Sequence, residues 1–213
     1  MNLANAERLL AIHQEVAGGG PGRKWDVDVL HRSAVVLLCA SWEAYCEDVV
    51  AEVIAHFTDH APPLELPPAL RKEIAKEFSA EGKSMLMWTL AGDGWQDVLR
   101  SRLAVFKKER DRGLNSPRPA PIQALFRDHV GYEDITAHWK WRGTTVAEAK
   151  AALNEFVELR GSIAHRVQAL RRLTKRDVDK HIRLVKHLVD ETDRAMVSHA
   201  HTVTGVNLAS NAD

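Results

Sequence analysis

The stretch Ala34–Ile54, AVVLLCASWEAYCEDVVAEVI, predicts a long core-forming helix, and the fold is organised around it. Placed at about 100° per residue, its apolar side chains cover a wide arc of the helix surface. We expect this helix to extend from about Val27 to Thr58, where Pro62-Pro63 follows. The residues on the apolar arc are Val35, Val36, Leu38, Cys39, Trp42, Tyr45, Cys46, Val49, Val50, Val53 and Ile54.

Glu43 occupies an unusual place on this helix. The other acids of the stretch, Glu47, Asp48 and Glu52, fall outside the apolar arc, whereas Glu43 lies near one edge of it. A carboxylate at this edge is partly desolvated, which is costly unless a cation or several donors meet it. Two interpretations follow: Glu43 has such a partner, or its carboxylate reaches water.

Helical periodicity continues through the rest of the chain, with no strand-like alternation. Six further helices are expected, at about residues 3–16, 69–79, 93–113, 122–129, 145–172 and 175–202. Two of them begin with capping signals, because Thr145 precedes Glu148 by three residues and Thr174 precedes Asp177 by three.

These elements predict an all-α protein with an antiparallel up-down helical bundle. The bundle helices are 3–16, 27–58, 145–172 and 175–202, and residues 62–142 form a helical elaboration between them. We expect residues 1–204 to be a single domain and residues 205–213 a frayed tail. Four of the six tryptophans lie between Trp88 and Trp141, which predicts a small core within the elaboration.

The charge is balanced overall and unevenly placed. Because the net charge is zero, a globally basic nucleic-acid binder is excluded. Residues 41–68 carry six acids and no Lys or Arg, whereas residues 160–194 carry ten Lys and Arg against five acids. A locally basic surface is therefore expected near the end of the chain.

Compartment and cofactors are constrained by what the sequence contains. Cys39 and Cys46 lie seven residues apart on one helix, roughly 10 Å along its axis, which is too far for a disulfide. Two buried free thiols fit a reducing cytoplasm, and neither a signal peptide nor a membrane span is predicted. No phosphate-binding loop or metal-ligand cluster stands out, so we expect no cofactor and no metal.

A second informative stretch is ELRGSIAHR, Glu158 to Arg166. Arg160 continues an apolar stripe and so faces the core, where a guanidinium needs a carboxylate or phosphate partner. On an unbroken helix His165 points about 140° away from Arg160. The two side chains meet if Gly161 permits a bend, or if two copies of the stretch face each other across a symmetric dimer. The alternative is a structural arginine beside a surface histidine.

Together, the phrase ASWEAYCEDVV at Ala40–Val50 and LRGSIAHR about 120 residues later resemble the HEPN superfamily. The closest resemblance is to its RiboL-PSP-HEPN branch, which has a Trp-Glu-x-Tyr phrase in an early helix and a late Arg-x4-His signature. This resemblance implies a helical bundle that forms a homodimer and, in active members, a metal-independent endoribonuclease. It also implies a role in bacterial defence or toxin–antitoxin biology, with an antitoxin or defence-system protein as a possible partner besides RNA.

The resemblance assigns roles to individual residues. Arg160 and His165 match the catalytic signature, and Glu43 matches the acid of the Trp-Glu-x-Tyr phrase. Histidine serves as acid or base near neutral pH, and a guanidinium stabilises a transition state that gains negative charge. The basic residues that follow are expected to contact the RNA backbone: Arg166, Arg171 and Arg172.

One position departs from the family pattern. The residue after the signature arginine is commonly polar, often Asn, and here it is Gly161. Two alternatives therefore stand beside the ribonuclease: a non-catalytic dimerising module that binds RNA, nucleotide or a partner protein, and a protein-binding bundle in which Arg160 ties two helices through Glu43.

Overall fold

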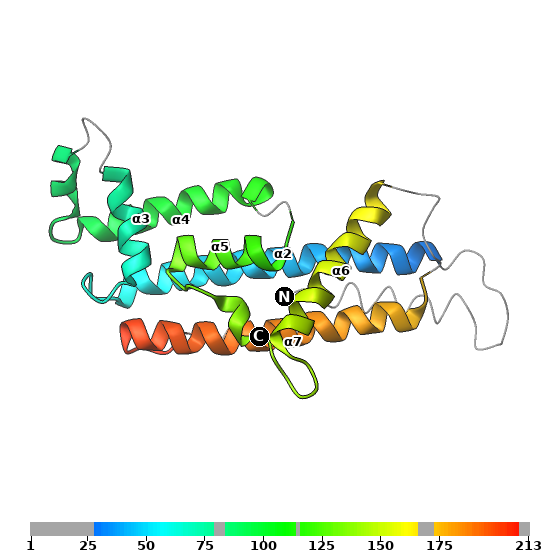
Figure 1. Ribbon diagram of the computed structural model, residues 1–213. Coiled ribbons are helices and arrows are strands. Elements are labelled where there is room, and N and C mark those ends of the chain that lie inside the picture. The colour runs from blue at the N-terminus through cyan, green and yellow to red at the C-terminus, as the bar shows by residue number, and fades with distance from the viewer. Residues whose placement is uncertain (1–27, 79–83, 114–115, 166–172, 209–213) are drawn as a thin grey trace. The chain divides into compact units, whose positions relative to one another are not determined.

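The computed structural model describes residues 28–78, 84–113, 116–165 and 173–208, and among these no β-strand forms. The α-helices are α2 (Asp28–His60), α3 (Pro68–Phe78), α4 (Gly94–Gly113), α5 (Pro119–Val130), α6 (Val146–His165) and α7 (Lys175–Thr204), as labelled in Figure 1. Two short 3-10 helices, η1 (Ser84–Leu90) and η2 (Ile135–His138), were not expected. The all-α prediction is confirmed.

The predicted helix bounds agree closely with the observed ones. α2 extends two residues beyond the predicted end, and α7 begins at Lys175 as predicted. Helix α6 is described as far as His165, and residues 166–172 of its predicted span lie outside the described residues. The helix expected at residues 3–16 also lies outside them.

Both capping predictions are confirmed by hydrogen bonds. The backbone amide of Thr145 donates to the Glu148 carboxylate at 2.8 Å, and the amide of Glu148 donates to Oγ1 of Thr145 at 3.3 Å. Thr174 and Asp177 repeat the arrangement at 2.8 and 3.3 Å. These reciprocal bonds satisfy amides that the first turn of a helix leaves without a partner, so they explain where α6 and α7 begin.

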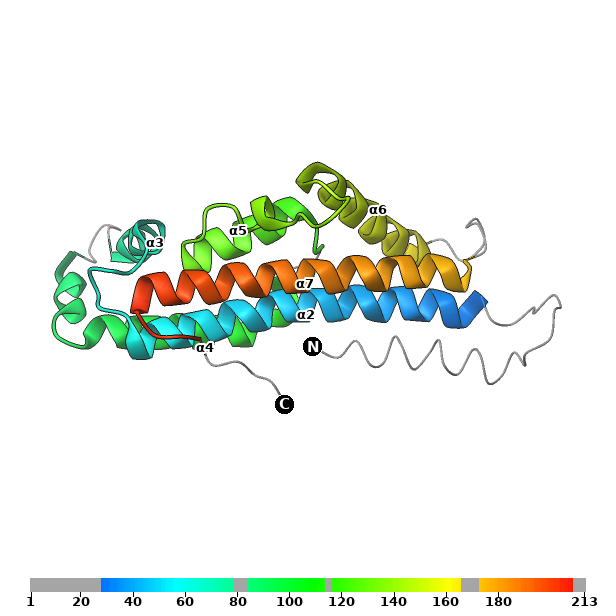
Figure 2. The ribbon, with the colours of Figure 1, turned by 90° about the horizontal axis from the view of Figure 1, so that it is seen from below.

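The chain divides into two compact units, and α2 and α7 run through both. Unit 1 comprises residues 1–45, 116–119 and 139–190, and unit 2 comprises residues 46–115, 120–138 and 191–213. In unit 1 the start of α2 lies beside the start of α7 (Figures 1 and 2). There Nδ1 of His31 donates to the carbonyl of Leu173 at 2.9 Å, and the Tyr45 hydroxyl donates to that of Val189 at 3.2 Å. Because the residue numbers of the contacting residues increase along both helices from one contact to the next, the two helices run parallel.

The core of unit 1 is built around Trp42 of α2. This side chain is fully buried, stacks on Tyr45 at 5.6 Å and meets Trp139 edge-on at 6.0 Å. The expectation of a tryptophan core within residues 62–142 is therefore wrong. Trp139 packs on the bundle helix instead, and Trp88 is 76% exposed.

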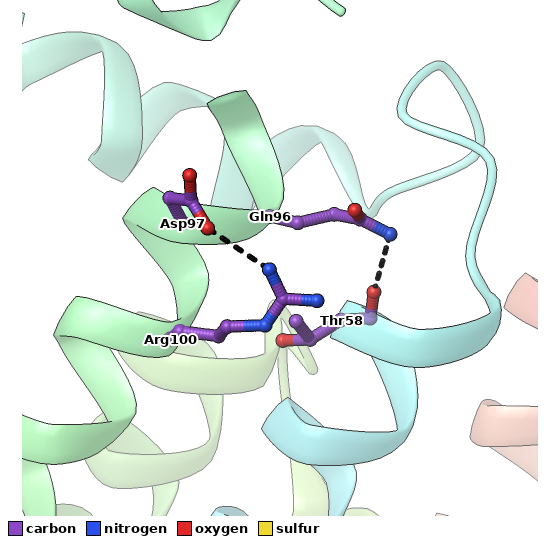
Figure 3. Close-up of polar contacts among 4 residues, drawn as sticks. All are labelled: Thr58, Gln96, Asp97 and Arg100. Carbon is purple, nitrogen blue, oxygen red and sulfur yellow. Dashed lines mark hydrogen bonds and ion pairs between the residues drawn. The ribbon is translucent and has the colours of Figure 1, made fainter. Parts of the chain in front are cut away.

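Unit 2 joins α3, α4 and α5 to the second halves of α2 and α7. Its buried apolar residues include Leu66, Leu70, Leu99, Ile122 and Phe126. Figure 3 shows how α4 begins against the end of α2: Nε2 of Gln96 donates to the carbonyl of Thr58 at 3.0 Å. One turn later Arg100 pairs with Asp97 at 2.9 Å on the exposed side.

Gly131 ends α5 in a conformation that its missing side chain permits. Its φ is 69°, in the left-handed region that favours glycine. A Cβ at this position would lie 2.5 Å from Cβ of Pro67. Glycine is therefore required both for the turn and for the close approach of the segment before α3.

No helix in the described ranges is both long and apolar enough to cross a membrane. The two cysteines are free and buried, as predicted.

Candidate functional site

Arg160 of α6 and Glu43 of α2 act electrostatically on the same thiol. Cys39 of α2 is 1% exposed, and its pKa is raised to about 11. Burial is the main cause, the Arg160 guanidinium lowers this pKa, and the Glu43 carboxylate raises it. Both charged groups therefore lie close enough to Cys39 to interact with it, and the structure brings α6 and α2 together here inside unit 1.

The helix geometry explains why these three side chains share one region. Cys39 and Glu43 are four residues apart on α2, so they lie on the same face. Arg160 and Glu43 are each half-buried. In this partly desolvated setting a guanidinium and a carboxylate interact more strongly than they do in bulk water. The sequence predicted that Arg160 faces the core, and the lowering of the pKa of the buried Cys39 thiol by Arg160 agrees with that prediction.

His165 is the last residue of α6, and its side chain lies outside the described residues. The proposed RNA contacts Arg166, Arg171 and Arg172 lie outside them as well. The backbone still constrains the signature, because α6 continues as an α-helix through Gly161 to His165. Position 165 is then about 140° around the helix from Arg160. A continuous helix argues against a bend at Gly161, and it fits either a pair that meets across a symmetric dimer or a structural arginine beside a surface histidine.

Gly161 is not required by the packing of α6. A Cβ at this position would meet nothing within 4 Å, and the residue is half-buried. The glycine thus leaves open space next to Arg160, and a larger residue fits there without a clash.

An ion pair that the sequence did not reveal involves a residue of α6 close to the Arg-x4-His signature. Arg118, in the segment before α5, donates from a guanidinium nitrogen to Oε1 of Glu158 at 3.1 Å. Both side chains are substantially exposed, so the pair is worth at most about 1 kcal/mol. Its effect is to connect the segment at residues 116–119 to the exposed side of α6, two residues before Arg160.

A buried histidine lies one helical turn from Arg160. His181 of α7 stacks on Phe156 of α6, with ring centroids 4.8 Å apart and planes inclined by 28°. Burial lowers the pKa of His181 to about 4, so the ring is neutral at pH 7. Phe156 and Arg160 are four residues apart on α6 and share a face. The buried Phe156 and the neutral His181 ring that stacks on it therefore lie about one helical turn from Arg160.

Glu47 corrects the single-arc interpretation of α2. It was expected outside the apolar arc, yet it is only 6% exposed, while Asp48 and Glu52 are exposed as predicted. Ala51 and Thr58 follow on the same side of α2 and are buried too, at 6% and 2%. The reason is that α2 is covered on a second side as well, so the apolar residues alone understate how much of the helix is buried.

The segment HFTDH, residues 56–60, has two histidines four residues apart, and in unit 2 His56 makes a structural hydrogen bond. Nε2 of His56 is hydrogen-bonded to Oγ1 of Thr204 at 3.0 Å, and burial is the main cause that lowers the pKa of His56. Among the residues that the structure describes, no group of three or more His, Cys, Asp or Glu side chains is arranged to hold a metal ion.

Comparison with known proteins gives one result. The RiboL-PSP-HEPN family model matches residues 2–198, which is most of the chain. No curated protein and no solved structure matches the sequence.

Proposed function

The chain belongs to the RiboL-PSP-HEPN family, and from this premise we propose that it is a metal-independent endoribonuclease with a composite site in a homodimer. HEPN membership suggests a HEPN-type nuclease or an RNA-related module. The finer proposal has Arg160 and His165 as the catalytic residues and Glu43 as the residue that positions them, and it assigns the protein to bacterial defence or toxin–antitoxin biology.

The observation that supports this proposal is that Arg160 of α6 and Glu43 of α2 both act electrostatically on the Cys39 thiol, which brings the two charged groups into one region of unit 1. A half-buried guanidinium has fewer orientations open to its planar fork than an exposed one. This restriction lets it stabilise negative charge with less reorganisation during the reaction. Glu43 acts through Arg160, so it is a positioning residue.

The chemistry requires an acid, a base and a fixed cation. A base takes the proton of the ribose 2′-hydroxyl, whose oxygen then attacks the adjacent phosphorus and forms a bond to it. The bond from phosphorus to the 5′-oxygen breaks, and an acid protonates that oxygen. Histidine suits both proton transfers near neutral pH, and two copies of His165 in a dimer supply one of each. The Arg160 guanidinium stabilises the negative charge that builds up on the phosphate oxygens.

A dimer would also allow Arg160 and His165 to act at one site although they point in different directions on α6. Because α6 is continuous, the two side chains of one copy diverge by about 140°. In a two-fold arrangement Arg160 of one copy and His165 of the other can approach the same phosphate. Arg166, Arg171 and Arg172, which follow His165 in sequence, supply further positive charge for the RNA backbone.

The first test is cleavage of labelled single-stranded RNA by purified protein in excess EDTA. We expect wild type to cut, and His165→Ala to be slower by at least about 100-fold, since general acid–base catalysis contributes roughly that much or more. The matched control is His201→Ala, an exposed histidine in unit 2, which should cut at the wild-type rate. Activity that EDTA abolishes and Mg²⁺ restores would contradict the proposal.

The second test addresses the composite site. Wild type is mixed with increasing amounts of His165→Ala protein under conditions that exchange subunits. If each site needs groups from both copies, activity falls faster than the wild-type share of the mixture, because mixed dimers lose one of their two histidines. Activity that falls in proportion to the wild-type share of the chains would show that each copy cuts by itself.

Gly161 favours a second candidate, a non-catalytic dimer that binds RNA. The glycine removes a polar side chain next to Arg160 at a position where the structure leaves room for one. If wild type binds RNA and does not cut it, Gly161→Asn tests whether that side chain is what is missing. Cleavage gained by Gly161→Asn and lost again with His165→Ala would identify an inactive member built on an intact site.

A further inference from the structure

A second surface of unit 1 carries an exposed aromatic pair that the proposed reaction does not use. It begins at the tight turn Trp141–Thr144, which precedes α6. The amide of Thr144 donates to the carbonyl of Trp141 at 2.9 Å, and the amide of Trp141 donates back at 3.2 Å. Gly143 has a φ of 78°, which suits the third position of such a turn. The turn therefore holds the backbone of Trp141 in a defined position and exposes Arg142 at its tip.

The indole of Trp141 lies flat against an imidazole of α7. The ring centroids of Trp141 and His187 are 4.7 Å apart, and the planes differ by only 13°. Both side chains stay partly exposed. In contrast, Trp139, two residues earlier, is fully buried against Trp42. Two neighbouring tryptophans thus have different places: one anchors the turn to the core, and the other presents aromatic surface to the outside.

Cationic residues lie near this aromatic pair on the turn and on α7. Arg183 precedes His187 by four residues on α7, so the two share a face, and Lys186 lies one turn from Arg183. Arg142, Arg183 and Lys186 are all exposed. Between Lys180 and Lys186 the helix has no acid, and the next one, Asp190, comes one turn after His187. The surface combines a flat ring stack with at least three cations.

We propose that the Trp141–His187 pair is a stacking platform for an unpaired base of single-stranded RNA, with Arg142, Arg183 and Lys186 contacting the adjacent phosphates. The choice of RNA as polymer rests on the proposed function, whereas binding at the platform does not depend on cleavage. Single-stranded nucleic acid is recognised by aromatic faces that stack on bases and by cations that follow the backbone, and this surface has both.

The stacked geometry favours an unpaired base over other anionic partners. An acidic peptide or a lipid headgroup would use the cations and gain little from a flat indole, whereas every base has a face that can stack on it. Bases within a duplex are already stacked on each other, so duplex RNA would use only the phosphate contacts. The platform lies on α7 about 9 Å beyond His181 by helical rise, in the same unit as Arg160.

The test measures binding of a fluorescent single-stranded oligoribonucleotide by anisotropy, in a His165→Ala background so that the RNA stays intact. We expect Trp141→Ala to raise the Kd about tenfold, as loss of one stacked base does, and Trp141→Phe to raise it much less. Arg142→Gln and Arg183→Gln should each lower the slope of log Kd against log salt by about 0.7.

Matched controls separate the platform from general effects. Trp88→Ala removes an exposed tryptophan of unit 2, and Arg71→Gln removes an exposed cation there; both should bind RNA as the background protein does. A duplex of the same length should lose little affinity on Trp141→Ala. Melting curves verify that each variant is folded. If Trp141→Ala is not folded, the comparison of Trp141→Phe with the background protein still tests the platform.

Three outcomes overturn the platform: an unchanged Kd for Trp141→Ala, an equal loss for single strand and duplex, or equal loss in Trp141→Phe and Trp141→Ala. Competition by polyglutamate or anionic vesicles as strong as that by unlabelled RNA would assign the surface to another anion. Cleavage by wild type reports on the proposed function separately. If Trp141→Ala cuts RNA at the wild-type rate, the platform proposal alone is contradicted. If RNA binds through Trp141 and is never cut, the ribonuclease proposal alone is contradicted.

Discussion

Three histidines of unit 2 and the charged residues Arg160 and Glu43 of unit 1 show two ways in which a polar side chain is held in the interior. In unit 2 the partly or fully buried histidines His56, His129 and His199 all have pKa values lowered chiefly by burial. His199 donates from Nε2 to the carbonyl of Val130 at 3.0 Å and meets Phe57 and Tyr132 edge-on. In unit 1, Arg160 and Glu43 instead bring opposite charges to one buried thiol.

This difference separates a structural polar residue from a functional one. A histidine that burial keeps neutral, with a backbone carbonyl or a ring as its neighbour, costs little and needs no ligand. An arginine remains charged wherever it is placed, so half-burying it costs free energy, and under the proposed function its charge is used in the reaction. The predictions below test this separation, in order of decreasing effect.

The largest expected effect comes from Arg160→Lys, which keeps the charge and removes the planar fork. We expect RNA cleavage to slow by about 100-fold, because preorganised charge stabilisation depends on geometry, while the melting temperature changes little. His199→Ala in unit 2 should do the reverse: a loss of roughly 2 kcal/mol in the free energy of unfolding with normal cleavage per folded molecule. Equal effects of both variants on cleavage would abolish the distinction between the units.

His181 tests whether unit 1 also contains a purely structural histidine. Its pKa is about 4 in the folded protein and near 6.5 in the unfolded chain, so below pH 6.5 the unfolded chain takes up a proton that the folded protein does not. Stability is therefore lost as the pH falls from 6.5 towards 4, by up to ~3 kcal/mol from this residue. Urea unfolding at pH 7.5 and 5 should show a smaller acid loss for His181→Phe than for wild type. The same slope in both proteins would refute the assignment.

Thr174→Ala should have a moderate effect that is independent of the charged site. It removes the two hydrogen bonds of the Thr174 hydroxyl, which accepts from the Asp177 amide and donates to the Asp177 carboxylate at the start of α7, so we expect a loss of about 1 kcal/mol in the free energy of unfolding. Thr174→Ser keeps the hydroxyl and should be nearly as stable as wild type. A large loss of RNA cleavage with unchanged stability would show that this end of α7 belongs to the site.

The smallest effect is the most direct measure of the site geometry. In a Cys46→Ala background, ¹³C NMR follows the titration of the Cys39 thiol from neutral pH upwards. Glu43→Gln should lower its pKa from about 11, because the carboxylate raises it, and Glu52→Gln on the exposed side of α2 should leave it unchanged. If Glu43→Gln has no effect, the carboxylate does not lie beside Cys39.

Much of the fold followed from local patterns. Helical periodicity with the breakers at Pro62-Pro63 and the threonine caps predicted α2 and α7 to within two residues and the start of α6 to within one, because these signals act within one or two turns. The 3-10 helices η1 and η2 were missed, since segments of four to seven residues carry too few side chains for a periodic pattern. The tryptophans were misassigned because composition does not indicate which helix a ring packs against.

For the candidate site, local patterns predicted the Arg-x4-His signature, the acid of Trp-Glu-x-Tyr and the core-facing position of Arg160. The folded structure was needed to find that Arg160 acts on the same thiol as Glu43, that Glu47 is buried, and that Trp141 stacks on His187. The physical reason is one of range. Caps and helical faces depend on neighbours within four residues, whereas the partner of a buried charge or an exposed ring lies on another helix, at a distance along the chain that no local pattern encodes.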